Sequence, residues 1–318
     1  MSRAAGLLLG HLADRALGDP GRFHPVAGFG RVAGALERRT YADARTRGAA
    51  YTLVLVGGTT AAGVVLERRT RGRAVMHTAV TAAATWAVLG GRSLDREAAT
   101  VGRLLDSDLV AARRRLTHLV GRDTRTLDPG EVARAVVESL AENTSDAVVA
   151  PLVLGSVAGV PGLLGHRAAN TLDAMVGHRS RRYRQFGWAS ARLDDLLNLP
   201  GSRLTAGLAV VLGEDRASAV RAWRRDARGH PSPNAGPVEA AFAGALGVRL
   251  GGSNVYGDAE DRHVEHRAVL GDGRPVVPAD IEAARTLAAR VHVGAVVVSV
   301  LVALVRERRS RRRRPPAR

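Results

Sequence analysis

The sequence contains no cysteine and no lysine among its 318 residues, and aromatic residues make up only 3% of it. Without cysteine there can be no disulfide, no thiolate nucleophile and no thiolate-bound zinc or iron–sulfur cluster. Without lysine, a Schiff-base lysine, a lysine general base and the lysine of a P-loop are also excluded. Any ATP site must therefore differ from that of a P-loop enzyme, and arginine must supply the positive charge.

The formal net charge is +17, and all of the basic charge comes from arginine. Such an excess indicates anionic partners, which include nucleic acid, phospholipid headgroups and phosphorylated substrates. Nucleic-acid modules that read or stack on bases usually need aromatic rings, and the chain has few of them and no zinc-finger or RNA-binding signature. We therefore expect no nucleic-acid partner.

Long uncharged stretches predict that the protein is embedded in a membrane. Residues 48–66 and 74–91 carry no charge, and each run approaches the ~20 residues that a spanning helix needs. The basic segment 67–73 between them is short, which predicts a helical hairpin. Residues 291–305 form a shorter apolar run whose flanking arginines can reach outward to the interface. A soluble helical core is the alternative, because alanine and glycine lower the hydrophobicity of these runs.

Residues 147–165 form another apolar run, interrupted by Pro151 and Pro161. A complete span here would separate the polar segments before and after it, so we expect a broken or re-entrant segment surrounded by protein. With three to five spans, the chain is expected to be a multi-pass protein of the inner (plasma) membrane. No signal peptide is recognisable. The arginine-rich tail 306–318 is expected to be disordered and, by the positive-inside rule, cytoplasmic.

Carboxylates recur at helical spacing between residues 128 and 146. Asp128 and Glu131 have the spacing of a capping box, with proline in the first turn. Glu138, Glu142 and Asp146 follow at i, i+4 and i+8, which places them on one stripe if the helix continues that far. A bound Mg²⁺ or a facing arginine would offset their mutual repulsion. A solvated acidic face is the alternative.

A second polar block spans residues 170–198. Asn170 and Asp173 share a helix face and precede the arginine-dense segment 179–184, which is suited to binding phosphate. Arg192 and Asp195, which are three residues apart, lie on one helix face. They are expected either to take part in the site or to form an ordinary intrahelical ion pair.

Two short segments near this block have structural as well as functional interpretations. Trp188 is expected either to contact a ligand or to serve as packing or as an interface anchor. In the segment 230–236, Asn234 or Ser232 is expected to cap the following helix and leave backbone N–H groups for an anion. The glycine-rich segment 251–257 predicts a turn.

Several long motifs occur in a fixed order along the chain. They are GDP at 18–20, HPV at 24–26, GRDT at 121–124, ESLAENTSDAVVAPL at 138–152, NTLDAMVG at 170–177, RYRQFGWASARLDDLLN at 182–198, HPSPNAG at 230–236 and GALGVRLGG at 244–252. In this set the chain resembles the CobD/CbiB family, the adenosylcobinamide-phosphate synthases of cobalamin biosynthesis. One departure is at Pro237 and Glu239, where the aromatic–Pro–Glu order of the family is missing, so no role is carried over to them.

The resemblance implies a membrane ligase that joins adenosylcobyric acid to (R)-1-aminopropan-2-ol or its phosphate through an amide. Because amide formation from a free carboxylate is uphill in water, ATP with Mg²⁺ is the expected driver. We expect the catalytic carboxylates to be Glu138, Glu142, Asp146, Asp173 and Asp195, of which the last four are also the candidate Mg²⁺ ligands. We expect substrate or phosphate contacts from Arg122, Asp123, Asn143, Asn170, Arg182, Tyr183, Arg184, Trp188, Arg192, Asp194, Asn198, Ser232 and Asn234.

The predicted architecture is all-α: one membrane-embedded helical bundle over residues 1–318, with the active site on polar, partly re-entrant loops and a motif core at 121–257. Other late enzymes of cobalamin synthesis are possible partners. Two other functions remain open from the sequence, a transporter for corrinoid or anionic solutes and a non-catalytic scaffold for corrinoid enzymes.

Overall fold

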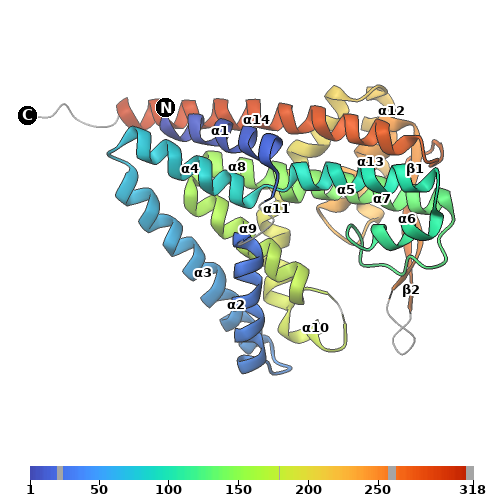
Figure 1. Ribbon diagram of the computed structural model, residues 1–318, viewed down its shortest axis with the longest axis horizontal. Coiled ribbons are helices and arrows are strands. Elements are labelled where there is room, and N and C mark those ends of the chain that lie inside the picture. Colours follow the sequence, from blue (N-terminus) through green and yellow to red (C-terminus); the bar gives the residue numbers. More distant parts are fainter. Residues whose placement is uncertain (20–23, 179, 257–262, 313–318) are drawn as a thin grey trace, which may run out of the picture. The chain divides into compact units, whose positions relative to one another are not determined.

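The computed structural model describes residues 1–19, 24–178, 180–256 and 263–312 (Figure 1). These residues form two compact units, each assembled from separate parts of the chain. The first unit takes Met1–Gly90, Ala150–Asn198 and the described part of Ala295–Arg318, and the second takes Gly91–Val149 and Leu199–Gly294. A single domain was expected over the whole chain, whereas each of the two units is described separately below.

The first unit is entirely helical within the described residues. Its complete helices are α1 (Ser2–Leu17), α2 (Pro25–Thr40), α3 (Arg45–Thr70), α4 (Ala74–Val88), α8 (Ala150–Ala158), α9 (Val160–Val176) and α10 (Tyr183–Phe186). It also contains the first part of α11 (Trp188–Leu212) and the last part of α14 (Asp280–Arg312). Within this unit α1 packs against α4, and α3 packs against α9.

The second unit combines helices with a small sheet. Its complete elements are α5 (Gly91–Leu105), α6 (Leu109–Leu116), α7 (Pro129–Thr144), the π-helix η1 (Ser145–Val149), α12 (Arg216–Asp226), the 3₁₀-helix η2 (Ala227–Gly229), α13 (Ala235–Leu246), β1 (Val248–Tyr256), β2 (His263–Leu270) and β3 (Arg274–Pro275). The remaining parts of α11 and α14 complete it.

Three segments of the described chain are long and apolar enough to cross a membrane: Arg45–Thr70, Ala74–Leu105 and Asp280–Arg309. The first and the start of the second are α3 and α4, which confirms the predicted hairpin. Only 28% of the apolar window in α3 is buried inside the protein, and Leu53 and Val54 are 73% and 62% exposed. Apolar surface of this kind favours a lipid environment, because in water it would be a large unpartnered patch.

The apolar run 147–165 is broken, as its prolines and glycines predicted. The break falls at Gly159, where the chain adopts φ 76° and ψ −148° between α8 and α9. Only glycine adopts this conformation at low cost. The Glu67 carboxylate of α3 closes the new helix end, because it accepts the N–H of Val160 at 2.9 Å. Whether the segment re-enters the membrane stays a prediction.

Replacing Gly159 with alanine is expected to destabilise the protein by about 2 kcal/mol or more, because of the positive φ. A Cβ there would also lie 2.3 Å from a Glu67 oxygen. Denaturant unfolding in mixed micelles measures the effect. Gly58→Ala is the control, since a Cβ at Gly58 meets nothing within 4 Å in the middle of α3, and a helical Gly→Ala change stabilises by up to ~1 kcal/mol. Equal stability of the two variants would contradict the assigned strain.

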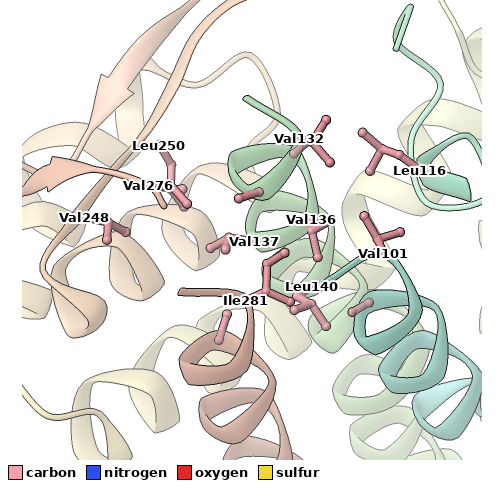
Figure 2. Packing of buried hydrophobic residues seen from close by; sticks show 14 of the residues in the cluster. Val101, Leu116, Val132, Val136, Val137, Leu140, Val248, Leu250, Val276 and Ile281 are labelled. Atoms are coloured by element: carbon pink, nitrogen blue, oxygen red, sulfur yellow. The ribbon is translucent and has the colours of Figure 1, made fainter. Parts of the chain in front are cut away.

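The core of the second unit is built around α7 (Figure 2). Asp128 and Glu131 form the predicted capping box, since each side chain accepts the backbone N–H of the other residue at 2.8–2.9 Å. Figure 2 shows Val136 and Leu140 of this helix beside Val101 of α5. Because the capping box fixes the N-terminal end of α7, the side chains in the following turns of this helix are held in a defined register.

The all-α prediction holds for most of the described chain but misses the sheet, whose strand order is β2-β1-β3. The segment from Gly251 was expected to be a turn. It belongs instead to β1, which pairs antiparallel with β2 and carries a bulge between Leu250 and Gly252. Gly251 has φ 82°, a value that suits a bulge glycine. Period-2 alternation is weak in this glycine-rich segment, so little in its residue pattern indicates a strand.

The predicted disorder of the tail is wrong in its first part. Residues 306–312 continue α14 without interruption, and residues 313–318 lie outside the described residues. The physical reason is that arginine is a good helix former and that no proline occurs between Arg306 and Pro315. A cytoplasmic location of this end stays a prediction.

Candidate functional site

Glu138 on α7 is the centre of a buried ionic network in the second unit. Its side chain is 2% exposed and accepts hydrogen bonds from Arg122 and from Arg134, the latter at 3.0 Å. The N–H of Gly251 at the β1 bulge donates at 2.8 Å to Oε1, the same carboxylate oxygen that Arg134 binds. Burial alone would raise the pKa of Glu138, but the two guanidinium groups outweigh it and hold the pKa below its usual value.

Arg122 also donates to the Oδ1 of Asn254 on β1 at 2.6 Å. The predicted site residues Arg122 and Glu138 are therefore joined, one from the loop before α7 and one from the helix. The alternative reading of Glu138 as part of a solvated acidic face is wrong. An ionised carboxylate that is paired twice and hydrogen-bonded to backbone is a rigid anchor, because its lone pairs are nearly all occupied.

Glu239 on α13 lies in the same network but lacks such partners. It is 1% exposed, and neither carboxylate oxygen accepts a hydrogen bond within the part of the chain that the structure describes. His230 Nε2 is 3.6 Å from one of its oxygens. Burial and then the charges of Glu138 and Glu142 raise the pKa of Glu239 well above its usual value. Burial without a hydrogen-bonding partner therefore favours the neutral, protonated form of this carboxyl group.

His230 is held as a neutral ring. The backbone N–H of Ser232 donates to its Nδ1 at 3.1 Å, so the ring proton lies on Nε2, the nitrogen that faces Glu239. Burial, with the charge of Arg267, lowers the pKa of His230. Neither Glu239 nor His230 was among the predicted site residues. His230 lies in the HPSPNAG motif, which stands out in the sequence. Glu239 lies three residues after that motif, and only its position as an acid in an otherwise apolar helix could have suggested it.

Glu142, one turn after Glu138 on α7, is reached by solvent. Desolvation by the surrounding protein raises the pKa of Glu142. The positive charge of Arg267 lowers this pKa, and the negative charge of Glu138 raises it further. Because solvent reaches Glu142 and not Glu239, Glu142 forms the accessible end of the network. We call Arg122, Arg134, Glu138, Glu142, His230, Glu239, Asn254 and Arg267 the ion cluster.

The predicted carboxylate stripe ends at Glu142. After Thr144 the α-helix passes into the π-helix η1, whose wider turn breaks the i, i+4 register before Asp146. Asn143 does not reach into the ion cluster through its amide nitrogen, which donates to Ser139 O at 3.0 Å on its own helix. Asp146 is partly buried and remains a candidate ligand close in sequence to Glu142.

A second group of predicted residues meets in the first unit, between α9 and α11. Asn198 donates to Asp194 at 2.9 Å, and its Oδ1 is 2.8 Å from His166 Nε2. All three side chains are buried. Because an amide oxygen only accepts, His166 must donate, and the chain of hydrogen bonds runs from His166 to Asp194. We call Asp194, Asn198, His166, Asn170, Asp173 and Asp195 the aspartate cluster.

Burial raises the pKa of Asp194 to about 7, with the charges of Asp173 and Asp195 adding to the rise. In the unfolded chain this carboxyl keeps its ordinary value, so between about pH 4 and pH 7 the folded protein binds the extra proton. Stability from this group is therefore present at low pH and is lost as pH rises towards 7.

Asp194→Asn is expected to abolish that loss, because the amide has no proton to release. The melting temperature of the parent, compared with that of Asp194→Asn, should fall as pH is raised from about 4 to about 8. Glu214→Asn is a suitable control, since Glu214 is exposed and forms no hydrogen bond or ion pair within the described residues. Parallel pH curves for the parent and Asp194→Asn would refute a proton held at Asp194.

The remaining predicted residues of the first unit lie mostly in surface contacts. Arg182 and the Tyr183 hydroxyl both bind Glu37 of α2, at 3.3 and 2.8 Å. Arg192 and Asp195 form the ordinary i, i+3 ion pair, at 3.8 Å and with Arg192 68% exposed. Two other residues are exposed, Arg184 and Trp188, and the Trp188 ring lies under Arg45. Arg179, in the same segment, lies outside the described residues.

Three residues predicted to bind phosphate have local roles. Ser232 caps α13 by accepting the N–H groups of Asn234 and Ala235 at 3.2 Å. The Asn234 side chain turns to Ser202, whose hydroxyl donates to its Oδ1 at 2.9 Å. Asp123 pairs with Arg125 at 2.8 Å. These contacts stabilise loops, and ligand binding by these residues stays a prediction.

No group of three or more His, Asp or Glu side chains placed to hold a metal ion occurs among the described residues. The four predicted Mg²⁺ ligands divide between the units, with Glu142 and Asp146 in one and Asp173 and Asp195 in the other. The predicted convergence of both groups into one pocket stays a prediction.

Comparisons with known proteins cover nearly the whole chain. The family model described as CobD/Cbib protein matches residues 7–288. The chain belongs to the CobD/CbiB family. It is 51% identical over 306 residues to the cobalamin biosynthesis protein CobD of Mycobacterium tuberculosis, covering 95% of this chain and 96% of that protein. It is 41% identical over 316 residues to CobD of Rhodobacter capsulatus, covering 96% and 99%.

Family membership makes this a protein of cobalamin biosynthesis with membrane character and supports an enzymatic role. The matched range contains both the ion cluster and the aspartate cluster and ends at residue 288, within the first part of α14. No solved structure matches the chain.

Proposed function

We propose that the protein is the ligase that joins the propionate carboxylate of adenosylcobyric acid to 1-aminopropan-2-ol or its phosphate, in an ATP-driven amide formation. The observation that carries this proposal is the ion cluster. It sets carboxylates whose pKa values are shifted in opposite directions beside three guanidinium groups, in a chain whose relatives are named for cobalamin biosynthesis. Acid–base and anion-binding groups in one place are what such a condensation requires.

Glu142 is the residue we assign to the proton transfer. The amine reaches the enzyme as an ammonium ion, which must lose a proton before its nitrogen can form the amide bond. Glu142 is the accessible carboxylate of the ion cluster and has a raised pKa. A base whose pKa is closer to neutral accepts this proton more effectively than an ordinary glutamate. The raised pKa of Glu239 favours its neutral form, which limits the negative charge near Glu142.

Glu138 acts as a positioning residue. Its bonds to Arg122, Arg134 and the β1 bulge fix α7 against the sheet, so that Glu142 is presented one turn later. Arg267, which influences both Glu142 and Glu239, supplies positive charge for an anionic substrate group.

ATP would supply the activation of the carboxylate, and Mg²⁺ would neutralise charge on the phosphates of the nucleotide. Asp146 is a hard oxygen donor of the same unit as the ion cluster, and Mg²⁺ with nucleotide commonly uses one or two protein carboxylates while keeping its waters. The donor chemistry of Asp146 therefore fits the ion, while Glu142 is assigned to the proton transfer.

Turnover of the purified protein in detergent tests the proposal. Adenosylcobyric acid, aminopropanol or its phosphate, and Mg-ATP are supplied, and the corrinoid product and ADP are measured by chromatography. Product formed together with ADP supports the ligase. Corrinoid binding without turnover favours a scaffold or carrier instead. Asp195→Asn, with membrane insertion intact, reports whether the aspartate cluster takes part in the same reaction.

A further inference from the structure

A group of basic side chains lies on the side of α5 that faces away from the hydrophobic core of the second unit. A cavity of about 650 Å³ is lined by residues of α5, by Arg115 of α6 and by Arg285 of α14, all within the second unit. Neither the proposed ligase reaction nor any predicted site residue uses it. Its walls are mainly charged, and five arginines face only two carboxylates, Asp95 and Glu97.

Both carboxylates are already paired. Arg285 donates to Asp95 at 2.9 Å, and Arg115 donates to Glu97 at 2.5 Å. The lining therefore keeps an excess of three positive charges. They belong to Arg92, Arg96 and Arg103, none of which makes an ion pair in the described chain.

The three arginines form one stripe on α5. Their positions i, i+4 and i+11 place them on the same face, opposite Leu94 and Val101, which are buried in the core. Like charges at i, i+4 repel and weaken a helix. An anion bound between them would reverse this penalty, and each guanidinium can grip phosphate oxygens with two parallel hydrogen bonds.

The position of this stripe along the chain favours a headgroup. Residues 74–91 carry no charge and form the apolar first part of the candidate span Ala74–Leu105, so Arg92 follows directly on this apolar run. Arginines at the end of an apolar run lie close to the depth of the lipid phosphates, and basic pockets there bind anionic headgroups. A soluble nucleotide offers the same phosphate chemistry.

We propose that this cavity is a binding site for a phosphate group, supplied by the headgroup of an anionic phospholipid or by a nucleotide. Binding in either case neutralises the arginine stripe of α5 and holds α5, α6 and α14 together around the ligand.

Binding to the intact, delipidated protein in detergent tests this. The probes are short-chain phosphatidylglycerol, short-chain phosphatidylcholine as the net-neutral headgroup, and ATP without Mg²⁺, each titrated by calorimetry. The variant is Arg96→Gln with Arg103→Gln. Both side chains are exposed and make no ion pair, so the fold is expected to survive. The control is Arg114→Gln with Arg224→Gln, two exposed arginines of the same unit outside the cavity.

We expect the variant to weaken binding of one anionic probe about tenfold or more, while the control leaves it unchanged. Loss confined to phosphatidylglycerol identifies a lipid site, and loss confined to ATP identifies a nucleotide site. Equal affinities of the variant and the control for both anionic probes would overturn the proposal. Because the readout is binding, this result is independent of whether the protein turns over corrinoid substrates.

Discussion

Replacing Glu142 with glutamine is expected to lower kcat for amide formation by roughly 10²–10⁴-fold, the usual contribution of a general base. Glutamine keeps the size of the side chain but cannot accept the proton that the ammonium substrate must lose. The KM for the amine should change much less, since substrate binding does not require this proton transfer. Steady-state kinetics of the purified variant measure both constants.

The pH profile separates this role from a structural one. Protonation of Glu142 should lower kcat on the acid side, beginning at a higher pH than for an ordinary glutamate because its pKa is raised. That acid limb should be missing from the residual activity of Glu142→Gln. Glu214→Gln, on the exposed surface of the same unit, should keep both the rate and the limb. A Glu142→Gln enzyme with unchanged kcat would remove Glu142 from the mechanism.

Glu138→Gln is expected to have the largest effect on stability, a loss of about 3–5 kcal/mol. The substitution removes the charge that balances Arg122 and Arg134, and Arg122 is only 7% exposed. An uncompensated buried guanidinium is costly because the protein interior cannot replace its hydration. Denaturant unfolding in mixed micelles, compared with Glu214→Gln, measures the loss.

A compensating substitution tests the cause. Combining Glu138→Gln with Arg122→Met removes a buried charge together with its partner, so part of the lost stability should return. If Glu138→Gln were as stable as the parent, the network could not be holding α7 against β1. If the double variant were no more stable than Glu138→Gln, the loss would come from packing and not from unbalanced charge.

Local signals in the sequence were accurate where local physics decides the structure. The charge-free runs and the short basic segment between them predicted the α3–α4 hairpin, because length and hydropathy are properties of the segment itself. The capping box at Asp128 and Glu131 formed for the same reason, since both partners lie within one turn. The break before α9 followed from the proline and glycine content of its own segment.

The candidate site was predictable only in part. Glu138 and Arg122 stood out as charged residues in conspicuous motifs, but that they pair follows from the approach of the loop before α7 to the helix. Glu239 was not predicted as a site residue, because it lies in an alanine-rich helix at a position where the family pattern is altered. Its burial next to His230 depends on how α13 packs, which no spacing along the chain encodes. The contacts of Arg182 and Tyr183 with Glu37 likewise depend on how distant helices pack, and phosphate binding by these two residues stays a prediction.

The sequence by itself determined which segments are helical and apolar, which helix ends are capped and to which family the motifs belong. Only the tertiary structure decided which charges are neutralised, which carboxyl groups keep a proton and which arginines remain available for an anion. The reason is that helix formation and hydropathy depend on residues a few positions apart. The ionisation of a buried group depends instead on burial and on charges brought from distant parts of the chain, and both exist only in the folded protein.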